Sequence, residues 1–264
     1  MKPSQSAPPP RTNILGVGVS AITMAMALAL IDGWIVSGAR EYVTVADVHS
    51  VMEAQRDEHL RRIHSRAGLV TPDGMPLVWL SRFYGQRHVE RVYGPDLMTA
   101  VCGHSTRYRH FFYGGKEGVP EKLATRLREK FVDLQVAGTY SPPFRPLTEE
   151  EDESVVRMIN AAGPDIVWVG LGAPKQERWM ADHRARLEAP VVIGVGAAFD
   201  FLAGLKRQAP RWMQRSGLEW SFRLMNEPRR LWRRYLVNNP LFVFYVLLQL
   251  SGLRQTQPGD PGRP

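Results

Sequence analysis

Cysteine is almost absent from this chain of 264 residues, which contains only Cys102. A single cysteine can form neither a disulfide within the chain nor a multi-cysteine metal site, so we expect no zinc. The low cysteine content also fits a reducing compartment. A dinucleotide-binding fingerprint is incomplete too, because the run from Gly16 to Ala21 has only two of its three glycines.

Acidic residues are scarce in one part of the chain. The net charge is +8, and the segment from Leu205 to Arg234 has nine Lys or Arg residues against only Glu219 and Glu227. This segment therefore carries most of the positive excess. Such a concentration indicates an anionic partner, which could be nucleic acid, phospholipid or a substrate that contains pyrophosphate.

Long apolar runs are few. The run from Ile14 to Val36 is long enough to span a bilayer, but it contains Asp32 and an early glycine pair. We favour a first strand over Ile14 to Val19 followed by a buried helix that ends near Gly33. The run from Leu241 to Leu253 is too short to cross a bilayer alone and too apolar to face water.

The middle of the chain alternates strand-like and helix-like periods. This alternation predicts an α/β fold with a Rossmann-like parallel sheet covered by helices, followed by a basic, amphipathic helical appendage. We expect one α/β domain over 13–204, the appendage over 205–253, and disordered termini over 1–12 and 254–264. The predicted strands are Glu41 to Ala46, Gly68 to Thr71, His110 to Tyr113, Leu134 to Ala137, Ile166 to Gly170 and Val191 to Val195. The predicted helices are Val48 to His64, Asp96 to Thr106, Pro120 to Phe131, Thr148 to Ala162 and Pro174 to Leu187.

Ligands of such sheets bind beyond the carboxyl ends of the strands, so the turns there are candidate sites. Asp73 and Gly74 directly follow an apolar run, where a carboxylate could act as a general base, although Pro-Asp-Gly is also an ordinary turn sequence. Gly114 and Gly115 resemble half of a phosphate cradle, but no complete P-loop follows them.

The most informative stretch runs from Ile166 to Gly204, where two apolar runs each end in a glycine-rich turn. The first turn has Gly172, a proline at the start of a helix, and then Gln176 and Glu177. Gln176 could read a base or a sugar hydroxyl, and Glu177 could instead only favour the helix dipole. The second turn has Gly196 and Asp200, and Asp200 is either a sugar ligand or a helix N-cap.

Several motifs follow one another along the chain: LVTPDGMPLVW, ERVYGPDL, TYSPPFRPLT, VWVGLGAPKQERWM, VVIGVGAAFDFLAG, QAPRW and GLEWSFRLMNEPRRLWRRYL. In this order they resemble those of the WecG/TagA/CpsF glycosyltransferases, glycosyltransferase family 26. The resemblance covers roughly Ile14 to Phe242, and it is greatest to members from exopolysaccharide clusters, including one that adds a sugar during xanthan assembly.

The resemblance implies an inverting enzyme that moves a sugar from a UDP-sugar donor to a polyprenyl-diphosphate-linked sugar, in the synthesis of exopolysaccharide or another surface polysaccharide. It implies that Asp73 is the catalytic base that deprotonates the acceptor hydroxyl. Arg91 matches the arginine of the ERVxG motif and would neutralise the pyrophosphate. The turns with Gln176, Glu177 and Asp200 would bind the donor.

Two departures from common patterns qualify this interpretation. No Asp-x-Asp pair is present to hold a metal under a nucleotide-sugar diphosphate, so we expect no metal and no cofactor. Members of the family often carry Asn just after the second strand, with Thr two residues before it. The matching positions here are Asp47 and Val45. Asp47 would suit sugar hydroxyls better than a pyrophosphate, and His49 is either a site residue or a helix-face histidine with a structural partner.

The basic segment then suggests a membrane surface as partner. Its tryptophans would lie at the headgroup level, and its arginines would contact lipid phosphates or the donor pyrophosphate; these are Arg207, Arg211, Arg215 and Arg223. We therefore expect a peripheral protein on the cytoplasmic face of the inner membrane. The alternative is a helical cover with tryptophans in the core and solvated arginines.

Two other functions stay open from the residues alone. A nicotinamide-dependent oxidoreductase would share the sheet and the glycine turns, although Asp47 lies about ten residues too late for its acidic residue. A nucleic-acid-binding protein would use the basic segment but would leave the run from Leu241 to Leu253 unexplained. The expected partners are thus the donor, the lipid-linked acceptor and a membrane, without nucleic acid, and a homo-oligomer is possible.

Overall fold

A computed structural model describes residues 8–104, 107–254 and 256–257 of the chain. Most residues of the two predicted disordered termini lie outside this range. Contacts between Cα atoms divide the chain into two compact units. Unit 1 contains Met24–Thr44 and Gly94–Arg207, and unit 2 contains Pro9–Thr23, Val45–Tyr93 and the chain from Gln208 onward. The single domain predicted over 13–204 therefore contributes residues to both units.

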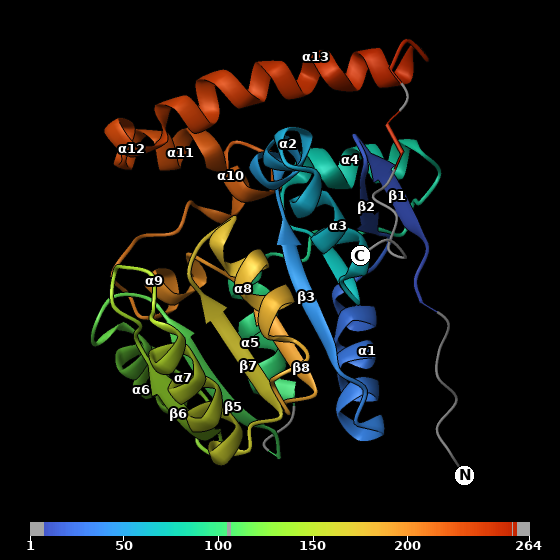
Figure 1. The fold of residues 1–264 in the computed structure, drawn as a ribbon. Coiled ribbons are helices and arrows are strands. Elements are labelled where there is room, and N and C mark those ends of the chain that lie inside the picture. Colours follow the sequence, from blue (N-terminus) through green and yellow to red (C-terminus); the bar gives the residue numbers. More distant parts are fainter. Residues whose placement is uncertain (1–7, 105–106, 255, 258–264) are drawn as a thin grey trace. The chain divides into compact units, whose positions relative to one another are not determined.

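A six-stranded sheet has the strand order β4-β3-β8-β7-β5-β6 (Figure 1). The pairs β3–β8, β8–β7, β7–β5 and β5–β6 are parallel, which confirms the predicted parallel α/β fold. The strands are β3 (Glu41–Ala46), β4 (Leu69–Pro72), β5 (Arg109–Gly114), β6 (Gln135–Tyr140), β7 (Ile166–Gly170) and β8 (Val191–Gly194).

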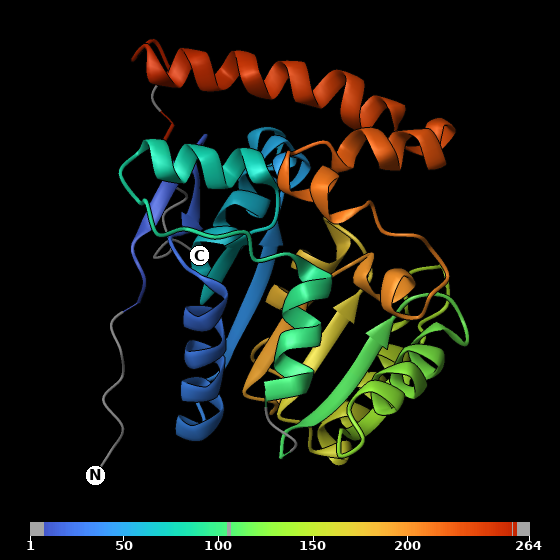
Figure 2. The ribbon, with the colours of Figure 1, turned by 180° about the vertical axis from the view of Figure 1, so that it is seen from behind.

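The helices of unit 1 cover both faces of its part of the sheet. Helices α1 (Met24–Ser37), α5 (Gly94–His104) and α6 (Val119–Lys130) lie on one face, whereas α7 (Glu149–Ala162) and α8 (Lys175–His183) lie on the other (Figures 1 and 2). The short α9 (Ala198–Leu202) packs against α5 and α6. Because the central strands are covered twice, Ile166, Val167, Trp168 and Val169 of β7 are all fully buried.

Unit 2 begins with a β-hairpin where a single strand over Ile14 to Val19 was expected. Strand β1 (Arg11–Ile14) pairs antiparallel with β2 (Val17–Ser20), and the turn between them puts Leu15 and Gly16 at positive φ. Arg11 and Thr12 therefore belong to a strand and not to a disordered leader. The expected continuation to a helix ending near Gly33 is wrong in its end point, because α1 runs on to Ser37.

Two helical regions of unit 2 differ from the prediction. The helix expected over Val48 to His64 is divided into α2 (Val48–Arg56) and α3 (Glu58–Arg66). Asp57 causes the break, since its backbone is extended and its side chain caps α3 by accepting a hydrogen bond from the Leu60 amide at 3.2 Å. Helix α4 (Met75–Phe83) was not predicted, although proline lies in its first turn.

The C-terminal appendage is helical and packs within unit 2. It consists of α10 (Arg211–Arg215), α11 (Glu219–Asn226), α12 (Pro228–Trp232), the π-helical η1 (Arg233–Val237) and α13 (Asn238–Leu250). Helix α13 packs against α2. Its Gln249 side chain also contacts the hairpin: Oε1 accepts a hydrogen bond from the Leu15 N–H at 2.8 Å, and Nε2 donates one to the Asn13 carbonyl at 2.9 Å. Within the described part of the chain, no helix is both long and apolar enough to cross a bilayer.

Glycine is required where β5 meets β7 at the carboxyl edge of the sheet. Gly114 has φ +124°, and a Cβ atom on it would lie 2.6 Å from the carbonyl carbon of Gly170. Its neighbour Gly115 donates a hydrogen bond to the Gly170 carbonyl at 3.0 Å. The turns after these two strands thus touch through their backbones, with no room for a side chain between them.

This packing predicts the effect of substituting Gly114. Gly114→Ala should lower the free energy of unfolding by more than about 2 kcal/mol, because the methyl group meets backbone that cannot move aside. Gly118→Ala is the matched control, since Gly118 also has positive φ (+78°) but open space around it. It should cost only about 1 kcal/mol. Urea denaturation measures both values, and equal losses would contradict the argument.

Candidate functional site

In unit 2, Asp73 and Arg91 form an ion pair at the end of β4. The Asp73 amide donates to the Ala46 carbonyl at 2.9 Å, which fixes the residue beside the end of β3. The Nη2 atom of Arg91 donates to Oδ1 of Asp73 at 3.3 Å, and Nε donates to the Asp73 carbonyl oxygen. The Asp73 side chain keeps 21% of its area exposed, so part of it is accessible to solvent.

The guanidinium of Arg91 also contacts Gln214, Glu219 and Tyr93. The same Nη2 atom donates to Oε2 of Glu219 on α11, and Nη1 donates to Oε1 of Gln214 on α10 at 3.3 Å. The ring of Tyr93 stacks below it, with its centroid 4.1 Å from the Arg91 Cζ atom. Arg91 was expected to neutralise a pyrophosphate, and here its three nitrogen atoms donate to Asp73, Gln214 and Glu219 of unit 2.

These contacts change the proton affinity of Asp73. Burial raises the pKa of its carboxyl to about 7, against the opposing effect of Arg91 and with the help of the nearby Glu219 carboxylate. Asp73 is therefore partly ionised near neutral pH and can both accept and release a proton there. A carboxylate with a raised pKa is a frequent feature of catalytic sites.

Asp47 has a structural environment at the start of α2. Its Oδ1 atom accepts hydrogen bonds from the Ser50 amide at 2.9 Å and the Ser50 hydroxyl at 3.1 Å, so it caps the helix. Its Oδ2 atom accepts from Nη2 of Arg234 at 2.6 Å. Although burial opposes ionisation, Arg234 and the cap hold the pKa of Asp47 well below its ordinary value. His49 contacts the Asn238 amide at 3.3 Å, which is the structural partner that one interpretation expected.

In unit 1, the two glycine turns meet at the side chain of Gln176. A Cβ atom on Gly194 would lie 3.1 Å from the Gln176 Nε2 atom, and one on Gly196 would lie 3.2 Å from its Oε1 atom. Gln176 Nε2 donates to Oε1 of Glu177 at 3.0 Å, and both side chains are buried. Gly172 has φ +76° with open space around it, as a turn that admits a ligand requires.

The other predicted residues of unit 1 lie at the same edge or close to it. Gly114 and Gly115 end β5, next to the turn after β7. Asp200 lies in the first turn of α9 and pairs with Lys206 at 3.0 Å. The N-cap interpretation of Asp200 is wrong, because the N-cap of α9 is Ala197.

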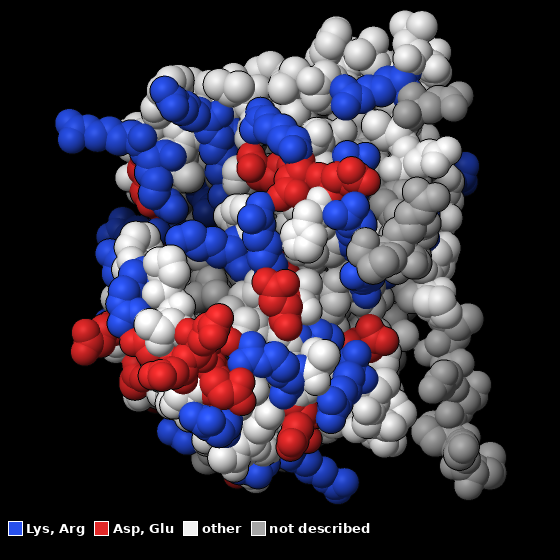
Figure 3. Space-filling model, viewed as in Figure 1, with Lys and Arg blue, Asp and Glu red and all other residues white. Residues whose placement is uncertain are grey.

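The basic residues of the appendage separate into two groups. Arg207, Arg211 and Arg215 are exposed, and Figure 3 shows Lys and Arg side chains gathered over α11 and α12. Exposed apolar side chains accompany them, including Trp212 with 64% of its area exposed. The tryptophans of this segment are therefore not core residues. Arg223 differs from the others because it interacts electrostatically with Asp47, Asp73 and Glu219.

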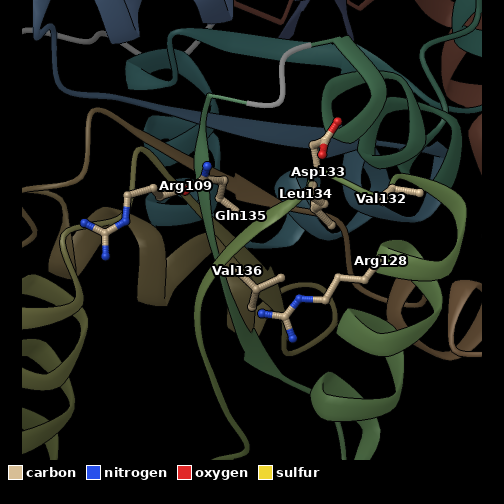
Figure 4. A pocket seen from close by; sticks show the side chains of 7 residues that line it. All are labelled: Arg109, Arg128, Val132, Asp133, Leu134, Gln135 and Val136. Atoms are coloured by element: carbon tan, nitrogen blue, oxygen red, sulfur yellow. The ribbon is translucent and has the colours of Figure 1, made fainter.

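A surface hollow at the opposite end of the unit 1 sheet contains none of the predicted site residues (Figure 4). It lies at the amino-terminal ends of β5 and β6. Its lining is Arg109, Arg128, Val132, Asp133, Leu134, Gln135 and Val136. Among the residues that the structure describes, no three His, Cys, Asp or Glu side chains form a group that could hold a metal ion.

Sequence reasoning missed three residues of the unit 2 site: Gln214, Glu219 and Arg234. Gln214 and Glu219 follow Arg91 by more than a hundred residues and pair with it only through the fold. Glu219 was treated only as one of two negative charges in a basic segment. Its position inside the motif GLEWSFRLMNEPRRLWRRYL was the one signal that could have identified it.

Comparison with known proteins identifies relatives over most of the chain. Residues 12–256 match the sequence model of the glycosyl transferase WecG/TagA/CpsF family. An N-acetylglucosaminyldiphosphoundecaprenol N-acetyl-beta-D-mannosaminyltransferase of Bacillus subtilis is 32% identical over 207 residues, which cover 78% of each chain. A protein of the same name from Staphylococcus aureus is 26% identical over 240 residues, 89% of this chain and 92% of the relative.

The Asp47–Arg234 ion pair should stabilise unit 2. In a double-mutant cycle with Asp47→Asn and Arg234→Gln, we expect a coupling free energy of about 1 to 3 kcal/mol by urea denaturation, since Asn retains the cap and loses only the charge. The contribution of Asp47 should be complete above its ordinary pKa of 3.8 and should decrease as the pH falls below that value. Strictly additive single effects would contradict a direct interaction.

Proposed function

The chain belongs to the glycosyl transferase WecG/TagA/CpsF family, and we propose that it transfers a sugar from a UDP-sugar to a sugar on a polyprenyl diphosphate. The two relatives above are named for transfer of N-acetylmannosamine to N-acetylglucosaminyldiphosphoundecaprenol. From these names we extend to this chain only the class of acceptor, a sugar on a polyprenyl diphosphate. We propose that the reaction belongs to the synthesis of a surface polysaccharide. The family match sets aside the oxidoreductase and nucleic-acid alternatives.

The observation that carries the chemistry is the partly exposed Asp73 carboxyl beside Arg91. Asp73 accepts the proton of the acceptor hydroxyl as that oxygen attacks the anomeric carbon of the donor. The bond from this carbon to the diphosphate breaks on the opposite side, so the configuration inverts and UDP leaves. Arg91 holds the Asp73 side chain in place through its contacts with both the carboxyl and the backbone carbonyl.

The glycine turns of unit 1 suit the diphosphate of the donor. Gly172 leaves its backbone accessible, and the polar amide of Gln176 lies directly behind Gly196. The Oε1 atom of Gln176 is buried and has no hydrogen-bond partner among the described residues, which favours a ligand group as its partner. Backbone N–H groups of these turns then supply a positive field for the diphosphate.

We also propose a peripheral position on the cytoplasmic membrane face. The exposed arginines and tryptophans of the appendage provide both contacts that an anionic bilayer favours. Helix α13 adds exposed apolar side chains, among them Val243, Phe244 and Leu247. Whether copies of the chain associate stays a prediction.

Substitution of the proposed base should abolish transfer. Asp73→Asn should lower kcat at least about a thousandfold while UDP binding stays within about threefold, because only the proton acceptor is lost. Glu58→Gln on α3 is the control, since that side chain is 74% exposed and is not among the charged groups that act on Asp73. UDP release measured with a lipid-linked acceptor gives the rates. Near-normal turnover of the Asn variant would exclude Asp73 as the base.

The pH dependence of kcat/KM in the wild-type enzyme should report the ionisation of Asp73. Asp73 must be ionised to accept a proton, and its pKa is raised to about 7. We expect kcat/KM to rise with pH below neutrality and to level off above it, with the acidic limb near that value. A flat profile between pH 5 and 8 would contradict this assignment.

Membrane binding should depend on the outer surface of α10. The triple variant Arg211→Gln, Trp212→Ser, Arg215→Gln should bind vesicles with anionic lipid at least about tenfold more weakly, since each arginine near the surface contributes about 1 kcal/mol. The matched control Arg128→Gln, Lys130→Gln, Val132→Ser removes the same charge and an exposed apolar group from unit 1. Co-sedimentation measures both. Equal binding by the two variants would disprove a specific role of α10.

A further inference from the structure

We propose that Glu219 on α11 is a positioning residue that shares Arg91 with Asp73 and so keeps the Asp73 carboxyl able to accept a proton. The inference depends on the proposed function, because it concerns the base of that reaction. It assigns to the C-terminal appendage a part in proton transfer that is separate from membrane contact. The argument rests on geometry within unit 2.

Two carboxylates share one nitrogen atom of Arg91, which carries two N–H groups. Nη2 of Arg91 donates to Oε2 of Glu219 and to Oδ1 of Asp73, and the Asp73 contact is the long one at 3.3 Å. Gln214 takes the other terminal nitrogen of Arg91, and its own Nε2 atom is fixed by the Ala209 carbonyl at 2.8 Å. Two residues of the appendage thus contact the terminal nitrogens of Arg91, and its contact with the Asp73 carboxyl is longer than its contact with Glu219.

The charges explain why this matters for a base. An arginine paired with Asp73 alone would hold the carboxylate ionised and make it a weak proton acceptor. With Glu219 present, two carboxylates share one guanidinium, and the second negative charge favours a proton on Asp73. The charged and titratable groups that act on Asp73 from the neighbouring elements are Arg91, Glu219, Asp47, Arg223 and Tyr93.

The burial of the three side chains makes the effect strong. Glu219 and Arg91 keep only 14% and 15% of their side-chain area exposed, so solvent screens their interaction weakly. Glu219 also lies in the first turn of α11, where the backbone N–H groups of a helix N-terminus attract negative charge.

The test is the pH dependence of kcat/KM in Glu219→Gln, which keeps the shape of the side chain and removes its charge. We expect the acidic limb to move to lower pH by about 0.5 to 1 unit, because Asp73 then loses a proton more easily. The plateau should fall about three- to tenfold, because an Asp73 carboxylate that pairs with Arg91 alone is a weaker base. Glu219→Asp should restore most of the limb position. The matched control is Glu227→Gln, which removes a glutamate of the same segment that pairs with Arg230 at the surface.

The possible outcomes separate this inference from the proposed function. A Gln variant that folds normally by thermal unfolding, yet keeps the wild-type acidic limb, would overturn the role of Glu219. If Asp73→Asn is inactive in the same assay, the base assignment survives that result. A general structural effect of Glu219 would lower the plateau without moving the limb, and this outcome also contradicts the inference.

Discussion

The guanidinium of Arg91 is the central contact between the separate elements of unit 2 that surround Asp73. It joins the end of β4, the strand-free segment before α5, and the helices α10 and α11, through Asp73, Tyr93, Gln214 and Glu219. A charge with so little solvent exposure is costly unless acceptors surround it, and every one of these contacts is an acceptor or an aromatic face. The same contacts that satisfy Arg91 bring the Asp73 carboxyl and the helical appendage together.

The appendage therefore has two different surfaces. Its inner residues are polar and paired, as Gln214, Glu219, Arg234 and Gln249 show. Its outer residues are basic or apolar and exposed. Removal of the whole segment would disturb the hairpin, the cap of α2 and the Asp73 pair together, so loss of activity on truncation could not be assigned to membrane contact. Substitutions on one surface at a time separate the two roles.

The sequence predicted the parallel sheet well because its strands are buried on both faces and appear as short apolar runs. Residues Glu41 to Ala46 and Ile166 to Gly170 were predicted with their observed limits. The β1–β2 hairpin was missed because Leu15 takes positive φ without a sequence pattern that demands it. Asp73 and Gln176 became candidates because they follow strands. Glu219 and Arg234 pair with residues far away in the chain, and the spacing of residues in a sequence does not predict such a pair.

Asp47 shows how a second carboxylate close to Asp73 is accommodated. The Asp47 carboxylate adds a negative charge, which by itself would disfavour ionisation of both groups. Arg234 compensates for that charge at 2.6 Å, and Ser50 satisfies the other oxygen. Asp47 thus caps α2, as an amide side chain could also do, and its charge forms an ion pair that links α2 to Arg234 of η1. The Asp47 carboxylate therefore serves a helix cap and a pair with Arg234, whereas Asp73, the base that we propose, shares its arginine with Glu219.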